Sequence, residues 1–238
     1  MGEERDRLIR RLGEKPLSKE EISDADLMER RMEYYRTQER LPPEVDALTG
    51  TVLVVGYGTL LSRASVARTV GPEVAERTFT PVVVPGFKRL FNLRPQHYEP
   101  SFRLSRDPVE VAAANVQRSP GSAFNGLAFG VSRDELSALD ERERYYGRIQ
   151  VTIQSFSDMR PLGSAFVYSA ESGSPWVFSE DLQLRPRWED VLLARSGAYR
   201  VGDAFGEMFD QTTFLADGKT RMMDRYAEDL SPPLEDLP

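Results

Sequence analysis

Residues 51–62 read Thr-Val-Leu-Val-Val-Gly-Tyr-Gly-Thr-Leu-Leu-Ser, and they decide the fold. The β-branched run Thr51–Val55 has the composition and length of a buried strand, and it stops at Gly56. Ser62 is a good N-cap for a helix that Gly71 would stop. The chain is therefore expected to pass from a strand, through a tight glycine turn, into a helix.

A strand, a turn with Gly56 and Gly58, and a helix invite a dinucleotide-binding interpretation. That fingerprint needs a third small residue for helix–strand packing and an acid at the end of the next strand. Here the third position is Leu61, and the next strand, which includes residues 81–85, carries no acid. We therefore reject this interpretation. The free N–H groups of such a turn suit a carboxylate or a developing oxyanion, although a plain strand-to-helix turn explains the same residues.

Further apolar or alternating segments follow the turn, separated by Gly, Pro and polar clusters. They predict strands over residues 79–84, 87–93, 109–116, 127–131, 149–156 and 165–168. Between them only two helices are expected, after Ser62 and after Ser132. Helical patterns return over 188–196, where Gly197 would end the helix, and over 199–209. This is not the regular alternation of a doubly wound sheet. We expect an α+β fold, with a mixed barrel or a strongly curved mixed sheet over residues 51–220.

The composition excludes several classes of function. The 238 residues include 31 Lys and Arg and 38 Asp and Glu, a net charge of −7, which argues against nucleic-acid binding because such binding depends on clustered cations. The chain has no Cys and one His, His97, so thiolate zinc sites, disulfides and His-rich metal sites are excluded, and no G-x-S-x-G nucleophile elbow is present. Neither a membrane span nor a signal peptide is apparent, so we expect a cytoplasmic protein.

Both ends of the chain differ from this central part. Residues 1–50 are rich in both charges, and Ser18 with Glu21 forms a capping-box pattern for a helix that Pro42 would end. We interpret this segment as a helical N-terminal arm that packs on the main domain or joins two subunits of a homo-oligomer. Residues 221–238 are expected to form an acidic, proline-containing tail.

Residues 132–147 place one carboxylate on the apolar face of a predicted helix. Ser132 and Glu135 form a capping box, and Gly147 is placed to end the helix. At helical spacing, Glu143 falls on a stripe with two leucines and a tyrosine. A carboxylate aimed at a core is costly unless it is paired, hydrogen-bonded or protonated, and burial raises its pKa toward the range of a general acid or base.

A structural alternative explains the same acid. If the helix frays after Arg142, Glu143 can reach solvent or pair with Arg144 or Arg148. The helical pattern alone leaves both interpretations open.

Together and in this order, the turn and the acid resemble the features of one known family. Residues 54–60, Val-Val-Gly-Tyr-Gly-Thr-Leu, resemble the Y-G-S-L/N segment of the gamma-glutamylcyclotransferase-like superfamily, which includes the AIG2-like proteins. Residues 139–143, Leu-Asp-Glu-Arg-Glu, resemble its L-D-x-x-E segment. Residues 146–151 and 165–168 are similar to the strands that follow that segment in the family. Thr59 departs from the pattern, because the family usually has Ser there.

This resemblance implies a small mixed β-barrel with few helices and an activity that uses no metal and no cofactor. The α-amino group of a small γ-glutamyl substrate would attack its own γ-carbonyl and give 5-oxoproline and a free amine or amino acid. Glu143 would be the general acid/base, and backbone N–H groups of the turn would hold the α-carboxylate or the oxyanion. The residues that the resemblance implies in substrate binding are Tyr57, Gly58, Thr59, Leu60 and Tyr168.

Two other functions remain open from the sequence. One is a related barrel enzyme that acts on a different amide through the same carboxylate. The other is a non-catalytic protein of the same fold that keeps the pocket as a receptor for a small anion.

Overall fold

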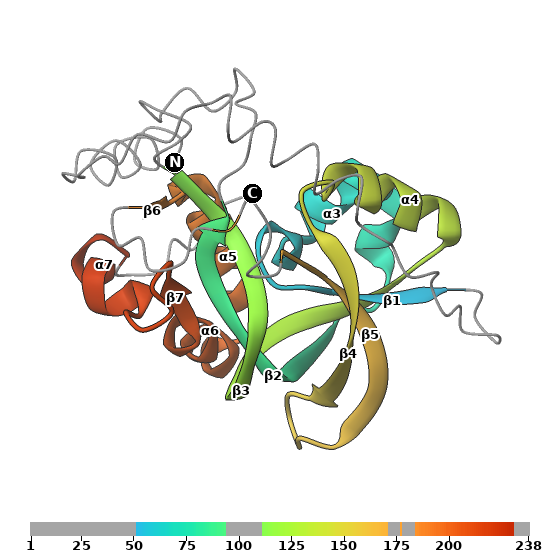
Figure 1. Cartoon of the computed structure of the whole chain (residues 1–238). Helices are drawn as coiled ribbons and strands as arrows, with labels where there is room; N and C mark the ends of the chain where they lie inside the picture. Colours follow the sequence, from blue (N-terminus) through green and yellow to red (C-terminus); the bar gives the residue numbers. More distant parts are fainter. Residues whose placement is uncertain (1–50, 94–110, 171–176, 178–183, 231–238) are drawn as a thin grey trace.

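The computed structural model describes residues 51–93, 111–170, 177 and 184–230 (Figure 1). They form a mixed α/β fold with a seven-stranded sheet and five α-helices. The strands are β1 (Val52–Gly56), β2 (Thr80–Leu93), β3 (Val111–Val131), β4 (Gly147–Ser155), β5 (Pro161–Ser169), β6 (Arg185–Pro186) and β7 (Thr213–Leu215). The helices are α3 (Arg63–Val70), α4 (Arg133–Arg142), α5 (Trp188–Tyr199), α6 (Asp203–Gln211) and α7 (Met222–Leu230), with the 3-10 helices η1 (Thr59–Leu61) and η2 (Pro72–Glu76). The expected N-terminal arm and the segment around His97 lie outside the described residues.

The strands pair in the order β6-β3-β1-β5-β4-β2-β7, and an additional pairing joins β3 to β2. β1 is antiparallel to β3 and parallel to β5, so the sheet is mixed. Because β2 pairs with β4 and also with β3, the pairings of β3, β1, β5, β4 and β2 form a closed circuit. The mixed sheet that the sequence predicts is thus present, and it curves strongly (Figure 1).

Two strands are longer than the sequence predicts. The segments 79–84 and 87–93 belong to one strand, β2, in which Gly86 adopts φ +81° at a shift of register against β3. Residues 111–116 and 127–131 of the two predicted segments likewise belong to β3, which has 21 residues. β2 and β3 pair over most of their length, so their Gly and Pro residues are accommodated within the strands instead of ending them.

The strand, turn and helix predicted at residues 51–62 are confirmed. β1 ends at Gly56, and the chain turns through η1 into α3. The hydroxyl of Ser62 caps α3 by accepting a hydrogen bond of 3.3 Å from the N–H of Ser65. Gly71, at φ +106°, follows the last residue of α3.

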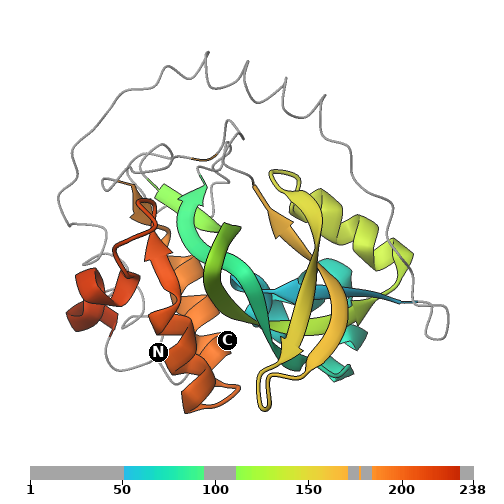
Figure 2. The same cartoon turned by 60° about the horizontal axis from the view of Figure 1, so that its bottom comes forward.

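The helices occupy two sides of the strands. α3 and α4 lie together on one side, and α5, α6 and α7 gather on the other (Figure 2). α4 begins with the predicted capping box, in which Ser132 and Glu135 exchange hydrogen bonds of 2.7 and 3.3 Å. It ends at Arg142 and not at Gly147, because Gly147 already begins β4.

The C-terminal helices differ in part from the expectation. The helix expected over 199–209 begins only at Asp203, because Gly202 adopts φ +146° between α5 and α6. α7 falls within the range expected to be a tail. Its Tyr226 is buried and packs edge-on against Trp188 with 4.6 Å between ring centroids. No helix within the described ranges has both the length and the apolar character needed to cross a membrane.

Candidate active site

The turn after β1 is held by two close backbone contacts. A Cβ atom on Gly56 would lie 2.5 Å from the carbonyl oxygen of Leu60, so only glycine lets the turn fold back on the strand. A Cβ atom on Gly197 of α5 would lie 2.9 Å from the carbonyl group of Leu61. The turn is therefore packed between the end of β1 and the backbone of α5.

A small cavity, with a volume of about 50 Å³, lies beside this turn. Its lining comes from the turn, β3, the end of α4, β5 and the first turn of α5. The lining residues are Tyr57, Gly58, Thr59, Leu60, Ala113, Ala114, Glu143, Tyr146, Tyr168 and Asp190. The structure thus brings together all six residues that the sequence assigned to the site, although Tyr57 and Tyr168 are 111 positions apart.

Glu143 stands directly after α4, as its C-cap, and 15% of its side chain is exposed. Its Oε1 lies 3.1 Å from Nε of Arg142. Burial raises the pKa of Glu143 above the ordinary glutamate value; the charge of Arg142 opposes this rise, and the charge of Asp190 adds to it. The helix does end where the structural alternative expected, but Glu143 stays at the cavity and pairs with Arg142. Arg144 and Arg148 have other acidic partners.

Arg142 connects this acid to the turn. Its Nη2 donates to the hydroxyl oxygens of Thr59 and Ser65, at 2.9 Å in both cases. Its Nη1 donates to the carbonyl oxygen of Ser65 at 2.8 Å and to the hydroxyl of Thr69 at 2.9 Å. Since the guanidinium is a rigid planar group, these contacts fix the end of α4 relative to the turn.

The three tyrosines of the cavity use their hydroxyl groups in fixed contacts. Tyr57 donates to the carbonyl oxygen of Tyr168 at 2.7 Å, and Tyr146 donates to that of Ala114 at 2.6 Å. Tyr168 donates to the carboxylate of Asp140 at 2.8 Å. Burial raises the pKa of all three hydroxyls, so they remain protonated donors. The Tyr168 hydroxyl is thus engaged with Asp140, and the charge of Glu143 is one of the causes that raise its pKa.

Asp190 is a site residue that the sequence analysis missed. It belongs to the first turn of α5, where an acid is ordinarily explained by the helix dipole. Here it lines the cavity, 14% of its side chain is exposed, and its Oδ1 lies 3.1 Å from Nη1 of Arg187. Burial raises the pKa of Asp190, and Arg187 opposes the rise. Within the described ranges, no group of three or more His, Asp or Glu residues is placed to hold a metal ion.

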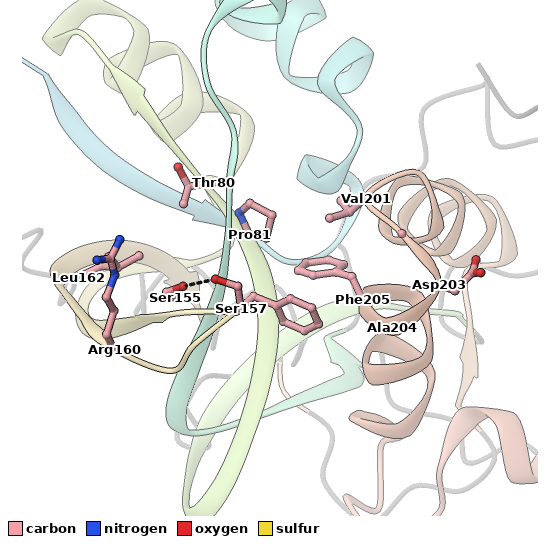
Figure 3. Close-up of a pocket in the computed structure, with 12 residues that line it drawn as sticks. Thr80, Pro81, Ser155, Ser157, Arg160, Leu162, Val201, Asp203, Ala204 and Phe205 are labelled. Atoms are coloured by element: carbon pink, nitrogen blue, oxygen red, sulfur yellow. Dashed lines mark hydrogen bonds between the residues drawn. The ribbon is translucent and has the colours of Figure 1, made fainter.

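A larger cavity, of about 530 Å³, lies between the β4–β5 hairpin and the connection from α5 to α6 (Figure 3). Phe205, Val201 and Leu162 give it apolar walls. Its charged lining residues are Arg160 and Asp203, and both are exposed. The smaller cavity contains two mostly buried acids whose pKa values are raised, a feature typical of functional sites, so it is the candidate active site.

Comparison with known proteins supports the fold. No family model and no curated protein matches the sequence. The human protein loc79017 has a similar structure, with a TM-score of 0.50 and 16% identity over 67% of this chain and 86% of that chain. A gamma-glutamyl cyclotransferase gives a TM-score of 0.48 at 15% identity, over 67% and 86% of the two chains. A yeast gamma-glutamyl cyclotransferase specific to glutathione gives 0.47 at 12%, over 72% and 97%.

Identities this low bear on the fold and leave the activity open. The solved structures that resemble this chain include gamma-glutamyl cyclotransferases. The chain thus has a fold similar to that of the human protein loc79017.

Proposed function

We propose that this chain is a gamma-glutamylcyclotransferase-like enzyme that converts a γ-glutamyl amine or peptide into 5-oxoproline and a free amine or amino acid. One observation carries the proposal: Glu143, a mostly buried carboxylate, lines the same small cavity as the turn from Tyr57 to Leu60. The sequence motifs and the fold support the same class of reaction.

The turn supplies the donors that this reaction needs. The first N–H groups of a helix have no acceptor within it, and those of Thr59 and Leu60 belong to η1. With Gly58, they would hold the α-carboxylate of the substrate or the oxyanion that develops at its γ-carbonyl. Tyr57 and Tyr168 would form the walls on either side.

Glu143 would carry the proton. It takes a proton from the α-ammonium group, and the freed amine nitrogen attacks the γ-carbonyl carbon to form the C–N bond of a five-membered ring. The proton then passes from Glu143 to the leaving nitrogen, and the original amide C–N bond breaks. The ring nitrogen gives its second proton to the freed Glu143 carboxylate, which passes it to the released amine, so that 5-oxoproline and a protonated free amine result. A raised pKa suits this double role, because a group that titrates closer to neutral pH both accepts and returns a proton readily.

The intramolecular attack explains why a covalent nucleophile is unnecessary. Nucleophile and carbonyl belong to one molecule, so orientation supplies much of the rate acceleration. The remaining requirements are one base and a set of oxyanion donors, which Glu143 and the turn would supply.

The test is an assay of 5-oxoproline after incubation of the protein with γ-glutamyl dipeptides and γ-glutamyl amines. We expect product from at least one of them and a loss of about 10²-fold to 10⁴-fold in kcat for Glu143→Gln. Glu141→Gln is the matched control and should keep full activity. Glu141 lies in α4, two positions before Glu143, and its side chain is 80% exposed. No product, or full activity in Glu143→Gln, would overturn the proposal.

Two further measurements, turnover of unrelated amides and binding of a small anion, separate the other two functions. Turnover of unrelated amides without turnover of γ-glutamyl compounds would indicate a related enzyme with another substrate. Binding of a small anion that Glu143→Gln leaves unchanged, without turnover, would indicate a non-catalytic receptor.

A further inference from the structure

We propose that Asp190 is a second carboxylate in contact with substrate, which holds the α-amino nitrogen while Glu143 removes its proton. This inference rests on the proposed function and adds a residue to it, from a helix that lies beyond the part of the chain that resembles the family.

Glu143 and Asp190 are alike in their burial and in the ion pairs that they form. Glu143 comes from the end of α4 and Asp190 from the start of α5, and their side chains are 15% and 14% exposed. Glu143 pairs with Arg142, the preceding residue, and Asp190 pairs with Arg187, three positions earlier, at 3.1 Å in both cases. Neither arginine lines the cavity, so the carboxylates face it and their counter-ions stand behind them.

This arrangement suits a cation. Among the described residues, the cavity lining includes two carboxylates and three tyrosines and no Lys or Arg. Two carboxylates around one small space repel each other, and the charge of Asp190 is one cause of the raised pKa of Glu143. An ammonium group between them would relieve that repulsion.

The α-amino nitrogen of the substrate has enough N–H bonds to contact both carboxylates. An ammonium group has three N–H bonds in addition to its bond to carbon. When one proton goes to Glu143, the amine keeps two N–H bonds and gains a lone pair. One N–H can still donate to Asp190, which keeps the nitrogen in place while the lone pair points at the γ-carbonyl carbon.

The glycine turn would complete the recognition of the substrate. Backbone N–H groups of Gly58, Thr59 and Leu60 would face the α-carboxylate, and the two acids would face the α-ammonium group. Together they match the free amino-acid end of a molecule. The substrate class is therefore a γ-glutamyl compound with an unblocked α-amino group.

A purely structural role for Asp190 has a matched control in Glu189. Both acids lie in the first turn of α5 and both pair with Arg187, which lies 2.8 Å from Glu189. The side chain of Glu189 is 20% exposed, but Glu189 does not line the cavity. Loss of the dipole or ion-pair contribution alone would affect both positions, whereas loss of substrate contact affects Asp190 only.

The experiment compares Asp190→Asn and Glu189→Gln in the full chain with two ligands that differ only in the α-ammonium group. L-Glutamate carries that group and glutarate lacks it, and calorimetry measures the binding of each. We expect Asp190→Asn to weaken L-glutamate binding by about ten- to a hundredfold and to leave glutarate binding unchanged. Glu189→Gln should change neither.

Two outcomes would overturn the inference: an Asp190→Asn protein that binds L-glutamate like the wild type, or one that loses both ligands equally. Thermal unfolding of each variant checks that it is folded. The 5-oxoproline assay is read separately. If Asp190→Asn keeps full turnover with an unchanged KM, this inference is overturned and the proposed function stands. If L-glutamate binding depends on Asp190 but no γ-glutamyl compound turns over, the contact with the ammonium group stands and the proposed function is overturned.

Discussion

Nη2 of Arg142 donates a hydrogen bond of 2.9 Å to the hydroxyl oxygen of Thr59, 83 positions earlier in the chain. The same guanidinium pairs with Glu143, so one side chain connects the glycine turn to the buried carboxylate. Serine at position 59 would offer the same acceptor oxygen to Arg142. Arg142 therefore helps to fix the distance between the glycine turn and Glu143.

Removing this connection should cost both stability and activity. We expect Arg142→Met to lower the free energy of unfolding by about 2–4 kcal/mol, because it leaves several partly buried acceptors and the Glu143 carboxylate without their donor. Formation of 5-oxoproline should fall as well. Chemical denaturation at neutral pH measures the first effect, and the product assay measures the second.

Arg144→Met provides the comparison. Arg144 pairs with exposed Glu141 at 3.5 Å, and surface pairs of this kind contribute about 0–1 kcal/mol. Equal losses in the two variants would show that Arg142 acts as an ordinary surface cation.

Local patterns predicted the parts of the site that local forces determine. The glycine turn and the capping box of α4 follow from short-range rules, and these two features placed Glu143 at the cavity. Arg89 shows where such rules fail. It is fully buried, donates to Thr213 and to Asn125, and lies over the ring of Phe209. In a strand pattern an arginine indicates a solvent-facing position, and its partners here lie 36 and 124 positions away.

Asp190 was missed for a related reason. An acid in the first turn of a helix already has a sufficient local explanation, so nothing in the sequence around it indicates a cavity. Only the pairing of distant strands brings α5 against the glycine turn, where Gly197 contacts Leu61.

That contact yields a second prediction. In most helices, Gly→Ala stabilises by up to about 1 kcal/mol. At Gly197 the added Cβ would meet the backbone of Leu61 at 2.9 Å, so we expect Gly197→Ala to destabilise by about 1–3 kcal/mol and to lower kcat by displacing the turn. Denaturation curves and the product assay check both effects, and a more stable variant would contradict the tight packing.

A third prediction concerns the ion pair that ties α4 to η2. Glu135 accepts hydrogen bonds of 2.6 and 2.7 Å from Arg77, and this contact lowers the pKa of Glu135. Gln at this position can still cap the helix, so Glu135→Gln should cost about 1 kcal/mol at neutral pH from the ion pair alone. Because the folded pKa is lowered, this contribution is present above the unfolded pKa and is lost as pH falls through the folded pKa.

Asp134→Asn is the control for that measurement. Asp134 lies in the same helical turn but is exposed. We expect a change within about 0.5 kcal/mol. A stability difference between wild type and Glu135→Gln that persists unchanged into acid would contradict the role of the ion pair.

The pH dependence of stability tests whether Glu143 is buried at the cavity. Its folded pKa is raised, chiefly by burial, whereas the unfolded chain has an ordinary glutamate pKa of about 4.3. The folded state therefore binds the proton more tightly. The contribution of this group to stability is complete below the unfolded pKa and is lost as pH rises through the folded pKa.

Glu143→Gln cannot ionise and escapes this loss. We therefore expect the free energy of unfolding of the variant, minus that of the wild type, to increase as pH rises from about 4 toward neutrality. The absolute offset also contains the lost pairing with Arg142, so the slope, and not the sign at one pH, is the quantity to measure. Denaturation at a series of pH values gives this slope, and Glu141→Gln, at an exposed side chain, is measured in parallel as the control. A flat or falling difference for Glu143→Gln would mean that its carboxylate is solvated, and the enzymatic role assigned to it would then lose its physical basis.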